Sequence, residues 1–353
     1  MESRGAAAII AVSLSVASAI LLAGFTPGIP AGAGAPGQSG YHVVKTIPIG
    51  GDGGWDYAVA DGDARRVYVS HATHVVVLDA ESGAIVGDIA DTQGVHGVAL
   101  APDLGRGFVS DGRANSVTIF ELKTLKTIAV VSTGGQNPDA IYYDAATNRV
   151  LAFNGRSGNA TVLEGADGMV AGMIPLGGKP EFAAGAGDGR VFVNIEDKSE
   201  LLEIDAQKLT VLHRWPLAPC EEPSGLAMDA KSRRLFAVCG NKMMVVVNAE
   251  TGKVVATPEI GEGPDATAFD PGTQLAFSSN GGSGTLTVIH EDSPDKYTVV
   301  ENAPTKKYAR TMALDEKTHV IYLPIADFED VAAAGERRPP MKAGMFGLLV
   351  VSK

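Results

Sequence analysis

Short apolar segments separated by turn-forming residues recur along most of the chain, and their lengths predict β-strands. Each copy of the pattern begins with a segment such as Pro-Asp-Ala, passes through apolar residues to Asp and a turn, and enters a strand that ends in Ser, Asn or Cys. A Gly/Asn/Ser loop, a strand of type Val-x-Val, a turn such as Glu-Ser-Gly and a last strand complete the copy. The pattern therefore predicts four short strands per copy.

The repeat can be counted from an anchor, the residue six positions before the Asp-type turn. The spacing between successive anchors is 41 to 45 residues, and the anchors are Trp55, His96, Pro138, Pro180, Pro223, Pro264 and Ala309. Four-stranded copies of about this length are typical of propeller blades rather than of helical solenoids. The predicted fold class is all-β, a seven-bladed β-propeller with four-stranded antiparallel blades.

The copy that starts at Pro223 shows the expected strands most clearly. They are Gly225–Met228, Leu235–Cys239, Met243–Asn248 and Lys253–Pro258. The third strand of each copy is mostly apolar, which is expected of a strand covered on both faces by neighbouring blades.

The last copy lacks a fourth strand. It offers Thr311–Leu314, Val320–Leu323 and Phe346–Ser352, whereas Tyr41–Ile49, ahead of the first copy, has the pattern of a last strand. Pairing of Tyr41–Ile49 with Phe346–Ser352 would close the ring and remove two exposed sheet edges. An insertion, Asp327–Lys342, interrupts this last blade and is either a lid or a decorative loop.

The amino terminus has the pattern of an export signal. Arg4 precedes an apolar run, Gly5–Phe25, and small residues suited to cleavage follow. The alternative is an uncleaved anchor, because the run is about long enough to span a bilayer. The predicted organisation is a signal peptide over residues 1–35, a linker over 36–40 and one propeller domain over 41–353. The expected location is periplasmic or secreted, with no membrane association after cleavage.

The chain is acidic, with a formal net charge of −12. Proteins that bind duplex nucleic acids usually present a basic face, because phosphate contacts supply most of the affinity. The charge therefore opposes nucleic acid as a partner. The expected partners are a small polar ligand or an envelope protein, and we expect a monomer.

Two strand motifs carry a family resemblance. Val67-Tyr68-Val69-Ser70 and Val191-Phe192-Val193-Asn194 resemble the Tyr-Val-Thr-Asn signature of YncE-like (YVTN-repeat) propellers, and the turns that begin at Asp205 and Asn248 are similar to theirs. The resemblance covers about residues 41–353. It implies an exported propeller with no general catalytic assignment; some members are described as binding DNA, which the acidic charge opposes here.

The residue after each anchor is expected at the rim of the central channel, because the first strand of each blade lines it. These residues are Asp56, Gly97, Asp139, Glu181, Ser224, Asp265 and Arg310. Four carboxylates around one opening repel one another unless a cation, a proton or a donor ligand joins them. They form either a site for Ca²⁺, Mg²⁺ or a cationic or polyol ligand, or structural turns in which Asp accepts backbone N–H groups.

Histidines gather on the same predicted face. His71 and His74 lie in a loop of the first blade, and His96 is the second anchor. A divalent ion, including zinc, is a possible cofactor on Asp56, Glu181 and these histidines; alternatively, the imidazoles fill the channel. Trp55 either stacks on a ligand or fills the channel as well. Polar residues of the other loops form a variable surface or simply make turns: Asn115, Asn154, Arg156, Asn194, Glu196, Asn241, Asn280 and Asp327.

The two cysteines fall in the fifth copy. Cys220 lies three residues before the anchor and Cys239 ends the second strand, so an antiparallel hairpin brings them to the same end. In an oxidising compartment they are predicted to form a disulfide; the alternative is two buried thiols.

No nucleophile elbow, P-loop, dinucleotide fingerprint or c-type haem motif is present in the sequence. The first hypothesis is therefore an exported binding propeller that recognises a small polar ligand, a cation or an envelope partner at the channel mouth. Its predicted ligand residues are Trp55, Asp56, His96, Asp139, Glu181, Asp265 and Arg310. The alternative is a metal-assisted, lactonase-like hydrolase in which a bound ion polarises a carbonyl and activates water.

Overall fold

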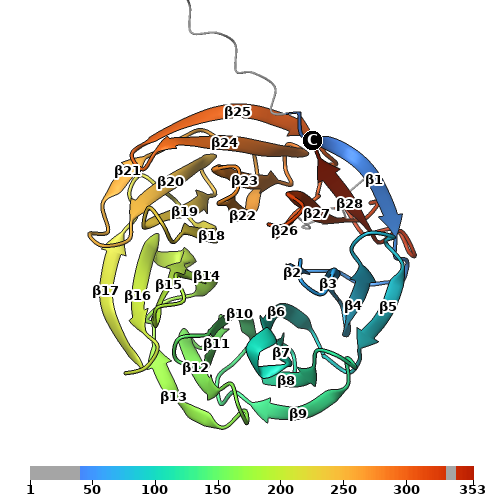
Figure 1. Ribbon diagram of the computed structural model, residues 1–353, viewed down its shortest axis with the longest axis vertical. Helices are drawn as coiled ribbons and strands as arrows, with labels where there is room; N and C mark the ends of the chain where they lie inside the picture. The colour runs from blue at the N-terminus through green and yellow to red at the C-terminus, as the bar shows by residue number, and fades with distance from the viewer. Residues whose placement is uncertain (1–39, 331–338) are drawn as a thin grey trace, which may run out of the picture. The chain divides into compact units, whose positions relative to one another are not determined.

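The protein folds into seven antiparallel four-stranded sheets, as predicted. A computed structural model describes residues 40–330 and 339–353. The sheets are the blades of a propeller and follow one another around a central axis (Figure 1). The predicted signal peptide and the middle of the predicted insertion lie outside the described residues. Within the described ranges, no helix has the length and apolar character needed to cross a membrane.

Each blade contributes one strand to each of four concentric positions. The innermost strands are β2 (Ala58–Asp61), β6 (Val95–Ala101), β10 (Pro138–Asp144), β14 (Pro180–Gly185), β18 (Pro223–Asp229), β22 (Pro264–Asp270) and β26 (Ala313–Asp315). The second strands are β3 (Arg66–His71), β7 (Arg106–Asp111), β11 (Arg149–Asn154), β15 (Arg190–Ile195), β19 (Arg234–Cys239), β23 (Leu275–Asn280) and β27 (Val320–Ile325). The third strands are β4 (His74–Asp79), β8 (Ser116–Glu121), β12 (Asn159–Glu164), β16 (Glu200–Asp205), β20 (Met243–Asn248), β24 (Thr285–Ser293) and β28 (Gly347–Ser352). The outermost strands are β5 (Ile85–Ile89), β9 (Thr127–Ser132), β13 (Val170–Pro175), β17 (Thr210–Pro216), β21 (Val254–Ala256), β25 (Lys296–Pro304) and β1 (His42–Pro48). Two short 3-10 helices are described, η1 (Pro102–Leu104) and η2 (Glu196–Lys198).

The predicted closure of the ring is confirmed. β1 pairs antiparallel with β28, with Thr46 opposite Leu349, so the two ends of the propeller domain share one blade (Figure 1). Ile47 is 6% exposed and belongs to an apolar cluster that joins this blade to the first, with Val67 and Leu348 among its members. Closure therefore buries apolar surface as well as pairing the edge strands.

The strand limits differ from the predicted ones where the backbone departs from ladder geometry. The outermost strand of the fifth blade covers only Val254–Ala256, and Pro258, which has no N–H to donate, lies beyond it. The innermost strand of the seventh blade begins at Ala313 rather than at Thr311, because Thr311 has a φ of 57°. A β-branched residue in this left-handed region cannot continue a strand.

The Asp residues by which the repeat was counted close the turn after the innermost strand. The Asp144 carboxylate accepts the N–H of Thr147 at 3.0 Å, and the Asp270 carboxylate accepts the N–H of Gly272 at 2.9 Å. Asp in such a turn replaces a backbone acceptor, which explains why this residue type recurs in five of the seven blades.

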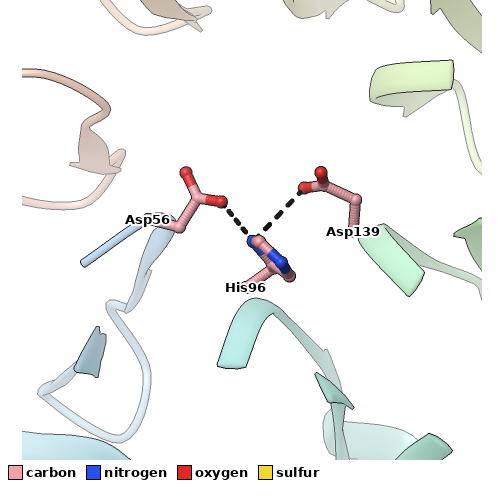
Figure 2. Close-up of side chains that lie close together, drawn as sticks. All are labelled: Asp56, His96 and Asp139. Atoms are coloured by element: carbon pink, nitrogen blue, oxygen red, sulfur yellow. Dashed lines mark hydrogen bonds and ion pairs between the residues drawn. The ribbon is translucent and has the colours of Figure 1, made fainter. Parts of the chain in front are cut away.

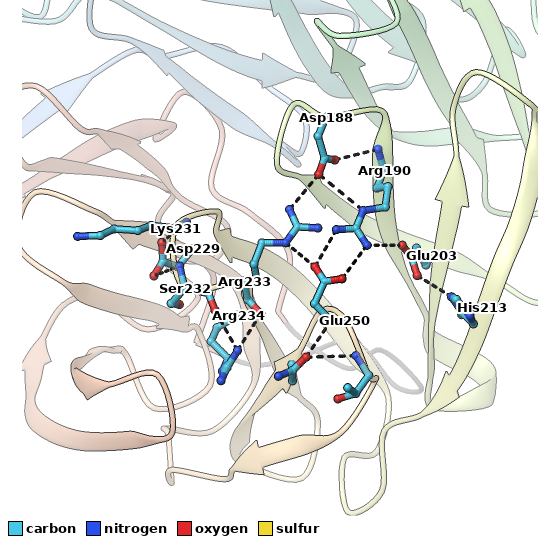
Figure 3. A network of polar contacts seen from close by, with 12 residues as sticks. Asp188, Arg190, Glu203, His213, Asp229, Lys231, Ser232, Arg233, Arg234 and Glu250 are labelled. Carbon is cyan, nitrogen blue, oxygen red and sulfur yellow. Dashed lines mark hydrogen bonds and ion pairs between the residues drawn. The ribbon is translucent and has the colours of Figure 1, made fainter.

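Charged side chains link the turns of the fourth and fifth blades (Figure 3). These turns follow the ends of the innermost strands, at the opposite end of the propeller from the residues where those strands begin. Arg190 contacts Glu250 at 2.7 Å and Glu203 at 3.1 Å, and Arg233 contacts Asp188 at 3.1 Å. Several charges in one network hold neighbouring turns in register better than an isolated exposed pair does.

The predicted disulfide is confirmed. Cys220 and Cys239 are bonded, with their Cα atoms 5.4 Å apart, and both side chains are buried in the apolar cluster of the fifth blade. The bond ties the chain that enters the innermost strand β18 to the end of β19, because the start of one strand faces the end of its antiparallel partner.

Candidate ligand site at the channel mouth

The residues predicted at the rim lie at β-bulges. In five blades the pairing of the innermost strand with its neighbour shifts just after the strand begins, for example between Pro138 and Ile141 and between Pro264 and Thr267. Asp139 and Asp265 fall inside these shifts. A bulge frees a residue from the ladder and redirects its side chain. The bulge thus lies at the rim position of five blades, whereas Asp56 and Arg310 come before the first residue of their innermost strands. We call this end of the channel the channel mouth.

Serine hydroxyls from the second strands hold this irregular backbone. The Ser70 Oγ accepts the N–H of Asp56 at 2.9 Å, and the Ser110 Oγ accepts the N–H of Gly97 at 2.8 Å. Ser110 also donates to the carbonyl of Asp139 in the next blade at 2.5 Å. These side chains satisfy backbone groups that the bulge removes from the ladder. Ser70 and Ser110 each stand one residue before the end of their second strand.

Asp56, His96 and Asp139 meet at the channel mouth from three successive blades (Figure 2). The His96 Nδ1 lies 2.6 Å from the Asp56 Oδ2 and 3.8 Å from the Asp139 Oδ1. The ligand-type atoms of the three side chains lie within 4.8 Å of one another. The two aspartates do not cap a turn of their own strand, as the structural alternative required. Their carboxylates face the imidazole instead.

Burial and charge set the protonation of this cluster. Burial opposes ionisation of Asp56, but the hydrogen bond from His96 and the charge of Arg310 outweigh it and keep the pKa of Asp56 below its ordinary value. Burial also opposes the imidazolium, yet the hydrogen bond to Asp56 and the charge of Asp139 raise the pKa of His96 to about 9. Burial and the charge of Asp56 raise the pKa of Asp139 to about 6. At neutral pH the cluster is therefore a carboxylate–imidazolium–carboxylate arrangement.

Stability is expected to fall as the pH rises from about 6.5 to about 9. Folded His96 holds its proton up to about pH 9, whereas the ordinary histidine value is 6.5, so the folded state binds more protons in this window. The free energy of unfolding should drop by on the order of 2 kcal/mol across it. Urea unfolding at pH 6.5 and pH 9 measures the drop. The drop should shrink in His96→Gln and persist in His213→Gln, because the His213 imidazole is half-exposed on an outermost strand, far from the channel mouth. An unchanged drop in His96→Gln would refute the assignment.

Arg310 closes the ring of charges between the seventh, first and sixth blades. Its Nη1 donates to the Asp56 Oδ1 at 3.3 Å and to the Asp265 Oδ2 at 3.4 Å, and its Nη2 donates to the carbonyl of Trp55 at 2.7 Å. Burial raises the pKa of Asp265, and Arg310 opposes the rise. The predicted rim residues Asp56, Asp265 and Arg310 are thus brought together.

Glu181 has a different partner. Lys179, just outside its own strand, lies 2.6 Å from the Glu181 Oε1 and also contacts Glu196. Burial, and then the charge of Asp139, raise the pKa of Glu181 to about 8. The acidic side of the channel mouth therefore takes up protons near neutral pH, which indicates a local shortage of positive charge.

Two aromatic side chains meet at the channel. The rings of Tyr57 and Phe182 lie 4.4 Å apart, centroid to centroid. Tyr57 comes from the first blade but packs against the apolar cluster of the third and fourth blades, so it reaches across the channel. The pair therefore places apolar side chains in the channel.

A cavity of about 480 Å³ opens beside the cluster and leads to solvent. Its polar lining comes from the starts of the innermost strands and from the loops that follow the second strands: Asp56, His96, Arg113, Asn115, Asn137, Arg156 and Arg310. The Asn115 Oδ1 accepts the N–H of Asn137 at 2.8 Å, which ties the loops of neighbouring blades together. Both asparagines have left-handed φ values, of 56° and 55°, which this residue type tolerates.

Gly112 makes room for the imidazole of His96. A Cβ at position 112 would lie 2.5 Å from the His96 Nε2, whereas a Cβ at Gly155, in the corresponding loop of the next blade, would meet nothing closer than 3.5 Å. Gly112→Ala is expected to displace the ring, lower the free energy of unfolding by about 2 kcal/mol and return the His96 pKa toward 6.5. Denaturation and an NMR titration check both effects, with Gly155→Ala as the matched control. Two variants with the same titration would contradict this geometry.

Three predicted site residues are placed differently. Trp55 is 6% exposed and packs against Phe346 at 5.5 Å, so it fills the wall and offers no open face for stacking. His71 and His74 do not join the Asp56 cluster, because they lie on the second and third strands of the first blade, at the end of β3 and the start of β4, farther from the axis. They line a separate cavity with Ile49 and Asp88. Burial and then the charge of His74 lower the pKa of His71, whose ring stacks on Phe346 at 4.2 Å.

Sequence reasoning missed five residues of the site: Arg113, Asn137, Lys179, Tyr57 and Phe182. A signal for the two aromatics exists in the repeat. They stand two positions after an anchor, where other copies carry small residues such as Ala140 and Gly225. No comparable signal marks Arg113 or Lys179, because neither stands at the rim position of its copy.

Comparison with known proteins supports the fold. No protein-family model matches the chain, and no curated protein matches it. The structure described as U3-55K superposes with a TM-score of 0.73 at 8% identity, over 90% of this chain and 99% of that one. The RRP9 WD40 repeats give 0.73 at 9%, over 90% and 98%. The hydrazine synthase of Kuenenia stuttgartiensis gives 0.65 at 14%, over 85% and 96%. Identities this low show the propeller scaffold alone; the YncE-like resemblance stays a prediction.

Proposed function

We propose that the protein is a binding propeller that takes up a small polar ligand at the channel mouth. The observation that carries the proposal is a cavity of about 480 Å³ at the channel mouth, lined by Asp56, His96, Arg310 and loop side chains. A concave site with few, convergent, charged groups on a rigid scaffold is the usual form of a small-ligand site.

Hydrogen bonds within the protein hold the side chains of the site in place without a ligand, which favours binding as the function. Serine hydroxyls fix the backbone on which Asp56 and Asp139 stand, and His96 and Arg310 hold the Asp56 carboxylate from two sides. A preorganised pocket loses little entropy when it orders a ligand. No residue of the cluster requires a role as a nucleophile in this proposal.

Screening against a library of polar metabolites tests the proposal. We expect a thermal-shift hit that isothermal titration calorimetry confirms at one site per chain. Asp56→Asn should weaken binding about tenfold or more, because a buried charge-assisted contact contributes a few kcal/mol. The matched control is Glu250→Gln, in the charged network at the other end of the blades. Binding that is equal in both variants would place the site elsewhere.

A second candidate function rests on the same three side chains. The ligand-type atoms of Asp56, His96 and Asp139 lie close enough together to hold a divalent ion. The ion would replace the proton on the His96 Nδ1, so its affinity should rise with pH. Such a site is the requirement for the lactonase-like alternative. Metal analysis after loading, with a lactone-hydrolysis assay, separates the two functions: a stoichiometric ion with turnover favours the hydrolase.

We also propose that the protein is exported and acts in the periplasm or outside the cell. The amino-terminal apolar run supports this location, and the Cys220–Cys239 disulfide is compatible with it. Cell fractionation with amino-terminal sequencing of the recovered protein tests both export and cleavage. Full-length protein in the cytoplasm would contradict the proposal.

A further inference from the structure

The cavity at the channel mouth has two sides of opposite charge. The inner side, toward the axis, carries the carboxylate of Asp56, and the Asp139 carboxylate of the same cluster lies beside it. The outer side carries Arg113 and Arg156, on the loops that follow β7 and β11. Charges separated in this way within one pocket select a ligand with the complementary separation.

The outer arginines are free to bind an anion. Arg113 and Arg156 are both exposed and line the same cavity. Among the described residues, neither guanidinium has an ion pair or a hydrogen bond, whereas Arg310 is engaged by Asp56, Asp265 and the carbonyl of Trp55. A planar guanidinium matches a carboxylate with two parallel N–H···O bonds.

The inner side offers an acceptor that lacks a donor. The Asp139 side chain is only 12% exposed, and its nearest cationic atom is the His96 Nδ1 at 3.8 Å. In the described part of the chain, no group donates a hydrogen bond to this carboxylate. An ionised carboxylate that is so deeply placed normally accepts two or more hydrogen bonds. A ligand ammonium would supply them.

The two subsites are neighbours. A Cβ on Gly155 would lie 3.8 Å from the Asp139 Oδ2, so the loop that carries Arg156 runs directly past the Asp139 carboxylate. The Asn137 side chain lies at the same place, 3.5 Å from that position, and can bridge the two charges with its amide. A short molecule with charges at both ends would reach from one subsite to the other.

We infer that the ligand is a small zwitterion, an amino acid or a related ammonium carboxylate. Its ammonium faces Asp139 and Asp56, and its carboxylate faces Arg113 and Arg156. This inference rests on the proposed function and narrows it to one ligand class. A simple anion would leave Asp139 without a donor and meet repulsion from the inner carboxylates. A simple cation would leave the two arginines without a partner.

Calorimetry with matched probes tests the inference on the intact protein. The zwitterions are glycine, alanine, 4-aminobutyrate and 6-aminohexanoate, which differ in the distance between their charges. Butylamine and butyrate each carry one of the two charges. We expect at least one zwitterion to bind about tenfold more tightly than both single-charge probes, a difference of about 1.4 kcal/mol.

Two variants separate the subsites. Arg113→Gln with Arg156→Gln should weaken the best zwitterion about tenfold and leave butylamine unchanged, whereas Asp139→Asn should weaken both. Arg190→Gln, outside the cavity, is the control. The arginine changes lie on exposed loops, and circular dichroism verifies that each variant is folded.

The outcomes are distinguishable from failure of the proposed function. Butyrate binding as tightly as every zwitterion, or arginine variants with full zwitterion affinity, would overturn the inference. If no zwitterion binds but an uncharged polyol does, with loss in Asp56→Asn, the inference is wrong and the binding function stands. If neither the probes nor the metabolite library bind, both proposals fail.

Discussion

Replacing Ile47 by Ala is expected to lower the free energy of unfolding by about 3 kcal/mol, because it opens a cavity in the seam that closes the ring. Ile47 is 6% exposed and packs with Val67 and Leu348 between the first and last blades. The neighbouring Val44, on the same strand but 49% exposed, is the control, and Val44→Ala should cost less than about 0.5 kcal/mol. Urea denaturation monitored by fluorescence measures both.

The contrast between these two positions tests closure rather than strand formation in general. Both residues belong to β1, so loss of strand propensity would affect them similarly. Equal, small effects would mean that β1 is not part of the core and that the last blade is stable without it. A shortened chain that lacks β1 should in addition expose the edge of β28 and aggregate.

Removal of the disulfide is expected to cost about as much. Cys220 and Cys239 are 19 positions apart, and a closed loop of this size stabilises a protein by about 3 kcal/mol in the chain-entropy model. Cys220→Ser/Cys239→Ser should lose this amount, as measured by urea denaturation of the variant and of the unreduced wild type.

The reduced wild type provides the control for packing. Reduction keeps both sulfur atoms in the buried cluster around Leu226 and Val245, so it should give nearly the same loss as the double substitution. No change in stability on reduction would contradict a native disulfide. Intact-mass analysis adds an independent check, because reduction should increase the mass by about two units.

The sequence was sufficient to predict the fold because the propeller repeats its local signals. The anchor spacing predicted seven blades, and the last-strand pattern at Tyr41–Ile49 predicted the closure by β1. Several predicted limits differ from the observed ones, and those at Pro258 and Thr311 differ because of single residues. These two strand ends depend on the missing N–H of Pro258 and on the φ angle of Thr311. The pattern shared by the copies of the repeat does not reveal either feature.

The site was predictable in part for the same reason. Asp56, Asp139, Asp265 and Arg310 occupy equivalent positions in their copies, so the repeat placed them around one opening before any contact was known. The predicted positions of His71 and His74 were wrong because residues at the same end of a blade can lie at different distances from the central axis. Arg113 and Lys179 were missed because neither stands at the rim position by which the repeat was read.

A crystal structure of the protein with its best calorimetric ligand tests the central claim most directly. We expect the ligand to lie at the channel mouth, with polar atoms within hydrogen-bond distance of Asp56, Asp139 or Arg310. A ligand bound instead in the cavity lined by His71, or on the outermost strands, would contradict it.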